Sequence, residues 1–106
     1  MELANMRTNA HDASRLLKAM ANERRLLILC HLSEGERSVG ELEDLLRISQ
    51  SALSQHLARL RSDNLVATRR SAQNIFYSLN GGQAEAVIGV LHDLICADGC
   101  VPSECG

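Results

Sequence analysis

The sequence is poor in aromatic residues. It has one phenylalanine, one tyrosine and no tryptophan among 106 residues, so its core must consist mostly of leucine, isoleucine, valine and alanine. A core of that kind is thin in a chain of this length, and we expect association with a second copy to stabilise it. The length predicts one domain, residues 1–106, with flexible ends at about 1–8 and 98–106.

Long apolar runs are missing as well. None approaches the roughly 20 residues that a membrane-spanning helix needs. Arg7, Asp12 and Arg15 interrupt the apolar positions near the start of the chain, which excludes a signal-peptide core there. The sequence also contains no repeats and no low-complexity linker. These absences predict a cytoplasmic protein without a membrane partner.

Motifs typical of enzymes are absent too. The sequence has no Cys-x-x-Cys pair, no phosphate-binding loop and no spacing typical of a catalytic triad, so we expect neither an enzyme nor a bound cofactor. Four cysteines without a secretion signal indicate thiol, metal or redox chemistry rather than a disulfide scaffold. These cysteines are Cys30, Cys96, Cys100 and Cys105.

Basic residues are missing from the last part of the chain. Residues 74–106 contain no lysine or arginine and four acidic residues, and residues 1–46 carry a net charge of −2. Residues 47–73, in contrast, carry five arginines and one aspartate, a net charge of +4. Positive charge gathered in one segment is typical of a nucleic-acid-binding surface, although five arginines can also cluster by chance.

The strongest pattern lies in the segment that begins at Ser49. Ser49 can cap a helix start, and Leu53, Leu57 and Leu60 then form one apolar stripe at helical spacing. The other side carries short or planar hydrogen-bonding groups, which can bind base edges and phosphates in a major groove. An ordinary amphipathic surface helix is the alternative. The groups on this side are Gln50, Ser51, Ser54, Gln55 and Arg59.

The preceding segment favours a DNA-reading helix. Residues 39–46 predict a short amphipathic helix, which Arg47 and Ile48 join to Ser49 through a tight link. Two short helices joined by a few residues form the helix-turn-helix pattern, although a plain helical hairpin shares it.

The following segment changes to strand periodicity. Residues 65–70 and 75–79 predict two strands, joined by polar residues 71–74. A basic hairpin directly after such a helix is typical of the wing of a winged helix. Its tip would carry Arg69, Arg70, Gln73 and Asn74.

Three further helices complete the prediction. They cover residues 9–20, residues 23–32 after the capping residue Asn22, and residues 83–97. The last helix has a wide apolar face with little charge, which suits a dimer interface. The sequence therefore predicts a mainly α fold with a small β-hairpin: a winged helix-turn-helix of about five helices plus a wing.

The chain resembles the ArsR/SmtB family of bacterial transcriptional repressors over about residues 12–96. The most specific matches are AMANERRLLILCHL (19–32), ERSVGELEDLL (36–46), SQSALSQHLARLR (49–61) and NIFYSL (74–79). Within the family it is most similar to the subgroup that includes BigR, SqrR, YgaV and HlyU. The resemblance implies a homodimer, formed through the first and last helices, that binds an imperfect palindromic operator in double-stranded DNA and releases it when an inducer binds.

The resemblance adds His56 to the candidate DNA contacts, because relatives carry the same Gln-His-Leu run, although His56 could instead pack against the neighbouring helix. The expected DNA-binding residues are Gln50, Ser51, Ser54, Gln55, His56, Arg59, Arg69, Arg70 and Gln73.

The metal sites of the family are not matched. Ser38 and Gly40 stand where one class of metal sensor has paired cysteines, and His92 and Asp93 lack the upstream partners that an interfacial zinc site needs. We therefore expect no metal site of either kind. A soft-metal site built from the four cysteines is an alternative, since thiolates bind Zn or Cu(I).

The resemblance implies a redox switch made of Cys30 and Cys96. In the persulfide- and redox-sensing relatives, cysteines at these motif positions form a disulfide or a bridge of several sulfur atoms. The expected inducer is therefore a persulfide, a polysulfide or an oxidant, with Cys100 and Cys105 as possible accessory thiols. The alternatives are that Cys30 and Cys96 are small buried hydrophobes, and that the chain is a metal sensor or a HlyU-like anti-silencer without thiol switching.

Overall fold

The computed structural model describes residues 3–95 of the chain. Its helices and strands are α1 (Leu3–Met20), α2 (Glu23–Ser33), β1 (Arg37–Ser38), α3 (Val39–Leu46), α4 (Gln50–Ser62), β2 (Val66–Ser71), β3 (Asn74–Leu79) and α5 (Gln83–Ile95). This confirms the predicted winged helix-turn-helix of five helices and a wing. The expectations for Cys96, Cys100, Cys105 and the end at 98–106 lie outside the described residues.

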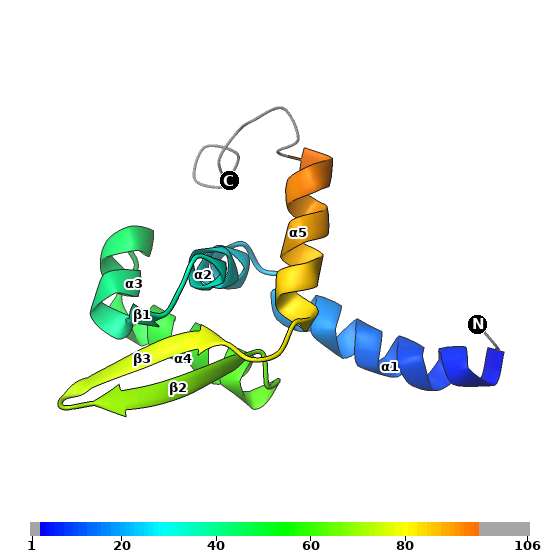
Figure 1. Ribbon diagram of the computed structural model, residues 1–106, viewed down its shortest axis with the longest axis horizontal. Coiled ribbons are helices and arrows are strands. Elements are labelled where there is room, and N and C mark those ends of the chain that lie inside the picture. Colours follow the sequence, from blue (N-terminus) through cyan, green and yellow to red (C-terminus); the bar gives the residue numbers. More distant parts are fainter. Residues whose placement is uncertain (1–2, 96–106) are drawn as a thin grey trace.

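The centre of the fold is α2. It packs against α1, α3, α4, α5 and β3, and Figure 1 shows it end-on between α3 and α5, with the wing and the start of α1 at opposite ends of the molecule. Ile28 and Leu29 of α2 are fully buried, together with Leu42 of α3 and Leu53 and Leu60 of α4. Burying a side chain of this size contributes about 1.5–3 kcal/mol, so the core fixes α4 firmly against α2.

Side-chain caps set where three of the helices begin. Asn22 accepts from the Arg25 amide at 3.1 Å, and Ser49 accepts from the Ala52 amide at 3.1 Å, which confirms both predicted caps. Ser38 caps α3 in a reciprocal pair with Glu41, a capping box that the sequence analysis did not include.

A left-handed residue sets the turn between α3 and α4. Arg47 has φ 54° and caps the end of α3, where its amide donates to the Glu43 carbonyl at 2.8 Å. The short link allows α4 to begin only a few residues after α3 ends. The predicted helix-turn-helix is therefore present.

The wing is larger and tighter than expected. β2 and β3 pair in antiparallel register from Val66 with Leu79 to Ser71 with Asn74, so only residues 72–73 form the turn. The polar side chains of Ser71 and Asn74 are typical of a turn, but the two residues pair with each other at the end of the strands. A third strand, β1, pairs with β3 at the opposite edge and gives the sheet order β1-β3-β2. Its two residues are too few to show strand periodicity.

The first helix also differs from its prediction. It begins at Leu3 rather than at residue 9, and no proline or glycine occurs in residues 3–8 to stop it. Within residues 3–95, no helix is both long enough and apolar enough to cross a membrane.

Candidate nucleic-acid interface

One side of α4 is exposed and uncharged over its first two turns. Gln50, Ser51, Ser54 and Gln55 are all exposed, whereas Leu53 and Leu57 on the other side are buried in the core. The buried leucines fix the rotation of the helix, and so they fix which polar groups face outward. Four of the expected DNA-binding residues therefore share one surface.

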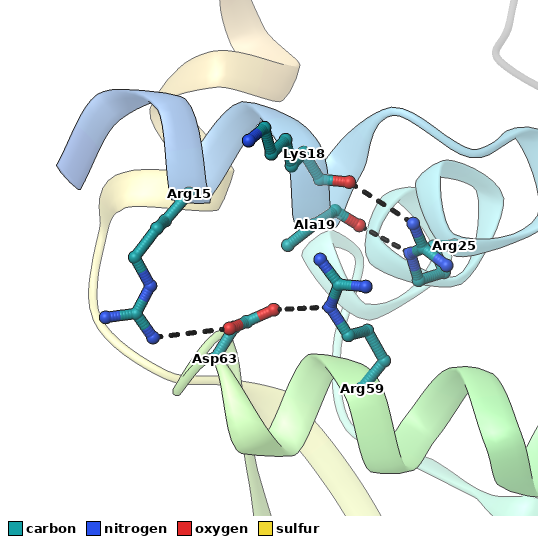
Figure 2. A network of polar contacts seen from close by, with 6 residues as sticks. All are labelled: Arg15, Lys18, Ala19, Arg25, Arg59 and Asp63. Carbon is teal, nitrogen blue, oxygen red and sulfur yellow. Dashed lines mark hydrogen bonds and ion pairs between the residues drawn. The ribbon is translucent and has the colours of Figure 1, made fainter. Parts of the chain in front are cut away.

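Arg59, near the end of the same helix, is held in an ion pair. Its Nε donates to the Asp63 carboxylate at 2.8 Å, and Arg15 of α1 donates to the other oxygen of that carboxylate at 3.5 Å. Figure 2 shows Asp63 between these two arginines. The Asp63 side chain is only 15 % exposed. Hydrogen bonds from Arg59 lower the pKa of Asp63, with Arg15 adding to the effect.

The guanidinium of Arg25 forms hydrogen bonds with the end of α1. Arg25 of α2 donates to the carbonyl of Ala19 at 2.6 Å and to that of Lys18 at 3.2 Å, as Figure 2 also shows. These carbonyls belong to the last turn of α1. Carbonyls in the last turn of a helix have no backbone N–H partner within that helix. The network thus connects α1 with both α2 and α4.

Arg69 on the wing is held in the same manner as Arg59. Its guanidinium donates two hydrogen bonds to the Glu36 carboxylate, at 2.7 and 3.0 Å, and lies 4.8 Å from the centre of the Phe76 ring. Hydrogen bonding from Arg69 lowers the pKa of Glu36. Arg69 therefore connects the wing to the segment before β1, while Arg70 and Gln73 are exposed towards the wing tip.

His56 does not share the exposed surface of α4. It is half-buried, and desolvation lowers its pKa, with smaller effects from the charges of Arg25 and Arg24 on α2. A histidine with a lowered pKa is mostly neutral near pH 7. The partial burial of His56 is in keeping with the packing alternative for this residue.

Arg61 is not among the expected DNA contacts, but the structure places it beside this surface. Arg61 is exposed on α4 and lines a hollow of about 550 Å³ between α4 and the wing. Arg61 lies in the last turn of α4, after the serine–glutamine group, and only its charge could have indicated a DNA contact. The hollow is lined by Val39, Gln50, Ser54, Leu57, Ala58, Arg61, Ser62, Ile75 and Tyr77.

Of the proposed redox pair, only Cys30 lies within the described residues. It is half-buried on α2, and the Ser33 hydroxyl donates to its backbone carbonyl at 2.6 Å. Ile95, the last described residue of α5, directly precedes Cys96 in the sequence. Among residues 3–95, no three histidine, cysteine or acidic side chains are grouped as a metal site would require.

The comparison with known families identifies the chain. Residues 22–68 match the family described as bacterial regulatory protein, arsR family. The transcriptional activator HlyU of Vibrio cholerae is 57% identical over 96 residues, which cover 91% of this chain and 89% of HlyU. The chain belongs to the ArsR family. The regulator YgaV of Escherichia coli is 45% identical over 96 residues, covering 90% of this ArsR-family chain and 97% of YgaV.

Solved structures of the family share the fold. Reduced HlyU from Vibrio cholerae matches with a TM-score of 0.84 over 89% of this chain and 99% of that one, at 57% identity. The repressor BigR from Xylella fastidiosa matches with a TM-score of 0.84 over 91% of this chain and 98% of that one, at 40% identity. These relatives are transcriptional regulators with a DNA-binding helix-turn-helix fold, not enzymes. The protein is therefore a transcriptional regulator of the ArsR family.

Proposed function

We propose that this ArsR-family protein is a homodimeric repressor that binds an imperfect palindrome and releases it when Cys30 and Cys96 react with a persulfide, a polysulfide or an oxidant. The observation that carries the DNA-binding part is the exposed serine–glutamine surface of α4. Side chains of these types form hydrogen bonds with base edges in the major groove, and a helix of this size fits that groove.

The contacts with bases come from the first two turns of α4, and those with the backbone come from the wing. Gln50, Ser51, Ser54 and Gln55 are exposed and carry no charge that repels phosphate. The wing adds Arg70 and Gln73, which are exposed near its tip. Three expected DNA contacts are less available. Arg59 and Arg69 donate to carboxylates of the protein, and His56 is half-buried.

The exposed apolar residues of α1 and α5 support a dimer. Leu17, Val90, Leu94 and Ile95 are each more than half exposed, at 57%, 57%, 75% and 66%. Large apolar side chains that remain exposed on a helix are typical of interaction surfaces. A second copy that covers both helices would remove these side chains from water, and a two-fold dimer would present two copies of α4 to successive major grooves.

The position of Cys30 supports the thiol switch. α2 carries Cys30 and packs against both α4 and α5, and Cys96 follows the described end of α5 in the sequence. In such a switch the thiolate of each cysteine attacks the outer sulfur of a glutathione persulfide and becomes a cysteine persulfide, while glutathione leaves as its thiolate. The outer sulfur of one cysteine persulfide then attacks the inner sulfur of the other and displaces hydrosulfide, which closes a bridge with one added sulfur. A bridge between α2 and the end of α5 would shift the dimer helices relative to α4. In line with redox sensitivity, one relative has been solved specifically as reduced HlyU.

An activator role is the second candidate. The relative at 57% identity is the transcriptional activator HlyU, whereas a relative from Xylella fastidiosa at 40% identity is a biofilm growth-associated repressor. Both roles use the same DNA-binding surface. They differ in where the bound site lies relative to the promoter.

Operator binding by single cysteine variants tests the switch. Wild type, Cys30→Ser and Cys96→Ser should bind a DNA duplex selected from a random pool with equal affinity when reduced. Glutathione persulfide or hydrogen peroxide should weaken binding by wild type alone. Peptide mass spectrometry should detect a Cys30–Cys96 link in the treated wild type, with added sulfur only after the persulfide.

Cys100→Ser and Cys105→Ser serve as matched controls. They should respond as wild type does. Loss of the response only in these two variants would contradict the assignment of Cys30 and Cys96. A wild type that binds DNA equally well before and after both reagents would favour a regulator without a thiol switch. A transcription assay from the selected site then separates repression from activation.

A further inference from the structure

We propose that the hollow between α4 and the wing binds the sugar–phosphate backbone of one DNA strand, with Arg61 as the residue that binds the phosphate. The inference rests on the proposed DNA binding by α4 and the wing, and it names a contact that the serine–glutamine surface does not include.

Residues of α4 and β3 form most of the lining of this hollow, to which we refer as the slot. Gln50, Ser54, Ala58 and Arg61 form one wall, and their spacing of four, four and three residues places them in a single stripe along α4. Residues 75 and 77 form the other wall from β3 and lie on the same face of that strand, because alternate residues of a strand do so. The slot therefore runs beside the helix that is proposed to enter the major groove.

The lining of the slot suits a phosphodiester backbone. Arg61 is its only charged residue, and no carboxylate lies among the lining residues. The Ser62 hydroxyl, which follows Arg61 in the lining, can also donate to a phosphate oxygen. On the opposite wall, Ile75 is 40% exposed and Tyr77 is half-buried, and these side chains offer apolar surface to a deoxyribose ring.

A second hollow provides a contrast within the same molecule. It measures about 520 Å³ and lies between α1 and the turn after α4. Asp12 and Asp63 both line it, and its one arginine, Arg15, already donates to Asp63. Carboxylates at this site repel a phosphate, so of these two hollows the slot beside the wing is the one suited to an anion.

Arg61 also differs from Arg59 and Arg69. These two arginines donate to Asp63 and Glu36, so a carboxylate already neutralises much of the charge that either could offer to a phosphate. Within residues 3–95, no carboxylate lies within ion-pair distance of Arg61. A phosphate can therefore bind Arg61 without breaking an existing pair, and a charge-assisted hydrogen bond of that kind is among the stronger ones.

Salt titrations of DNA binding test the proposal, with Arg61→Gln compared with Arg7→Gln, which removes the same charge from an exposed arginine near the start of α1. The probes are the selected duplex and a scrambled duplex of equal length. For Arg61→Gln, affinity for both duplexes should fall by roughly tenfold at low salt, and the slope of log K against log salt should decrease by about 0.9 for each bound protomer. Arg7→Gln should leave the slope unchanged.

Ile75→Glu provides a second test, because it places a carboxylate in the slot on an exposed position of the wing. It should weaken binding to both duplexes at least as strongly as Arg61→Gln, while thermal unfolding shows that the variant is folded. A folded Ile75→Glu protein with wild-type affinity would overturn the proposal. So would an unchanged salt slope in Arg61→Gln, or a loss confined to the selected duplex. A wild type that binds neither duplex would reject the proposed function itself, and this inference with it.

Discussion

The surface formed by α4 and the wing differs in chemistry from the surface formed by α1 and α5. The first exposes serine, glutamine and arginine, including Ser54, Gln55 and Arg61. The second exposes aliphatic side chains, of which Leu94 is 75% exposed and Ile95 is 66% exposed. One small core therefore supports a polar surface suited to DNA and an apolar surface suited to another protein chain. α2 lies between them and contacts both α4 and α5.

The arginines show the same contrast on a smaller scale. Arg15, Arg59 and Arg69 are paired with carboxylates, and the pairs of Arg15 and Arg69 connect separate elements of the fold. Arg61 and Arg70 are exposed and have no carboxylate partner within residues 3–95. A shared residue type thus serves two purposes, and the neighbouring carboxylates decide which.

A charge on the apolar surface should have the largest effect. Leu94→Glu would place a carboxylate where the proposed dimer buries an aliphatic side chain, and an unpaired buried charge is strongly unfavourable. We expect a monomer by light scattering, and a loss of roughly 100-fold or more in affinity for the selected duplex, because two linked half-site contacts become one.

Leu45→Glu is the matched control for this change in oligomeric state. Leu45 is also an exposed leucine, at 45%, but it lies on α3. This variant should have the same mass in solution as wild type. If Leu94→Glu and wild type have the same mass in solution, the apolar surface of α5 is not the dimer interface. The proposal that this surface binds a second copy of the chain is then wrong.

Removal of one amide from the polar surface should have an intermediate effect. Gln55→Ala should weaken binding to the selected duplex by about 1–3 kcal/mol and leave binding to the scrambled duplex almost unchanged, because a base contact carries sequence information and a phosphate contact does not. Fluorescence anisotropy on both duplexes measures this. Gln83→Ala, an exposed glutamine at the start of α5, should change neither affinity. Equal losses on both duplexes for Gln55→Ala would argue against base reading.

Removal of the carboxylate that connects the two surfaces should have the smallest effect. Asp63→Asn keeps the shape of the side chain but weakens its pairs with Arg59 and Arg15. We expect a loss of about 1 kcal/mol in the free energy of unfolding at pH 7, since partly exposed pairs contribute little. Urea unfolding measures it.

The pH dependence of this loss has a defined sign. The pKa of Asp63 is lowered in the folded protein, so its stabilising contribution is present above the ordinary aspartate pKa of about 3.9 and disappears as the pH falls through the folded value. Wild type and Asp63→Asn should therefore converge in stability at strongly acidic pH, provided that both are still folded. A constant difference at all pH values would show that the ion pairs are not its cause.

Local sequence signals were sufficient for the helix-turn-helix. The Ser49 cap and the spacing of Leu53, Leu57 and Leu60 fixed the start of α4 and its buried side, because caps and apolar stripes act within one helix. The exposed serines and glutamines could therefore be predicted correctly as a group. β1 could not be predicted, because two residues form a strand only when a distant partner, here β3, is already in place.

The sequence by itself determined the fold class, the elements that form it and the side of α4 that faces outward. These follow from periodicity and capping over a few neighbouring residues. Only the tertiary structure decided which arginines are paired. Glu36 lies 33 positions from Arg69, and Arg15 lies 48 positions from Asp63, and both contacts depend on the packing of separate elements. It also decided that His56 is half-buried, and that Arg61 lies in a slot whose second wall is a strand formed later in the chain.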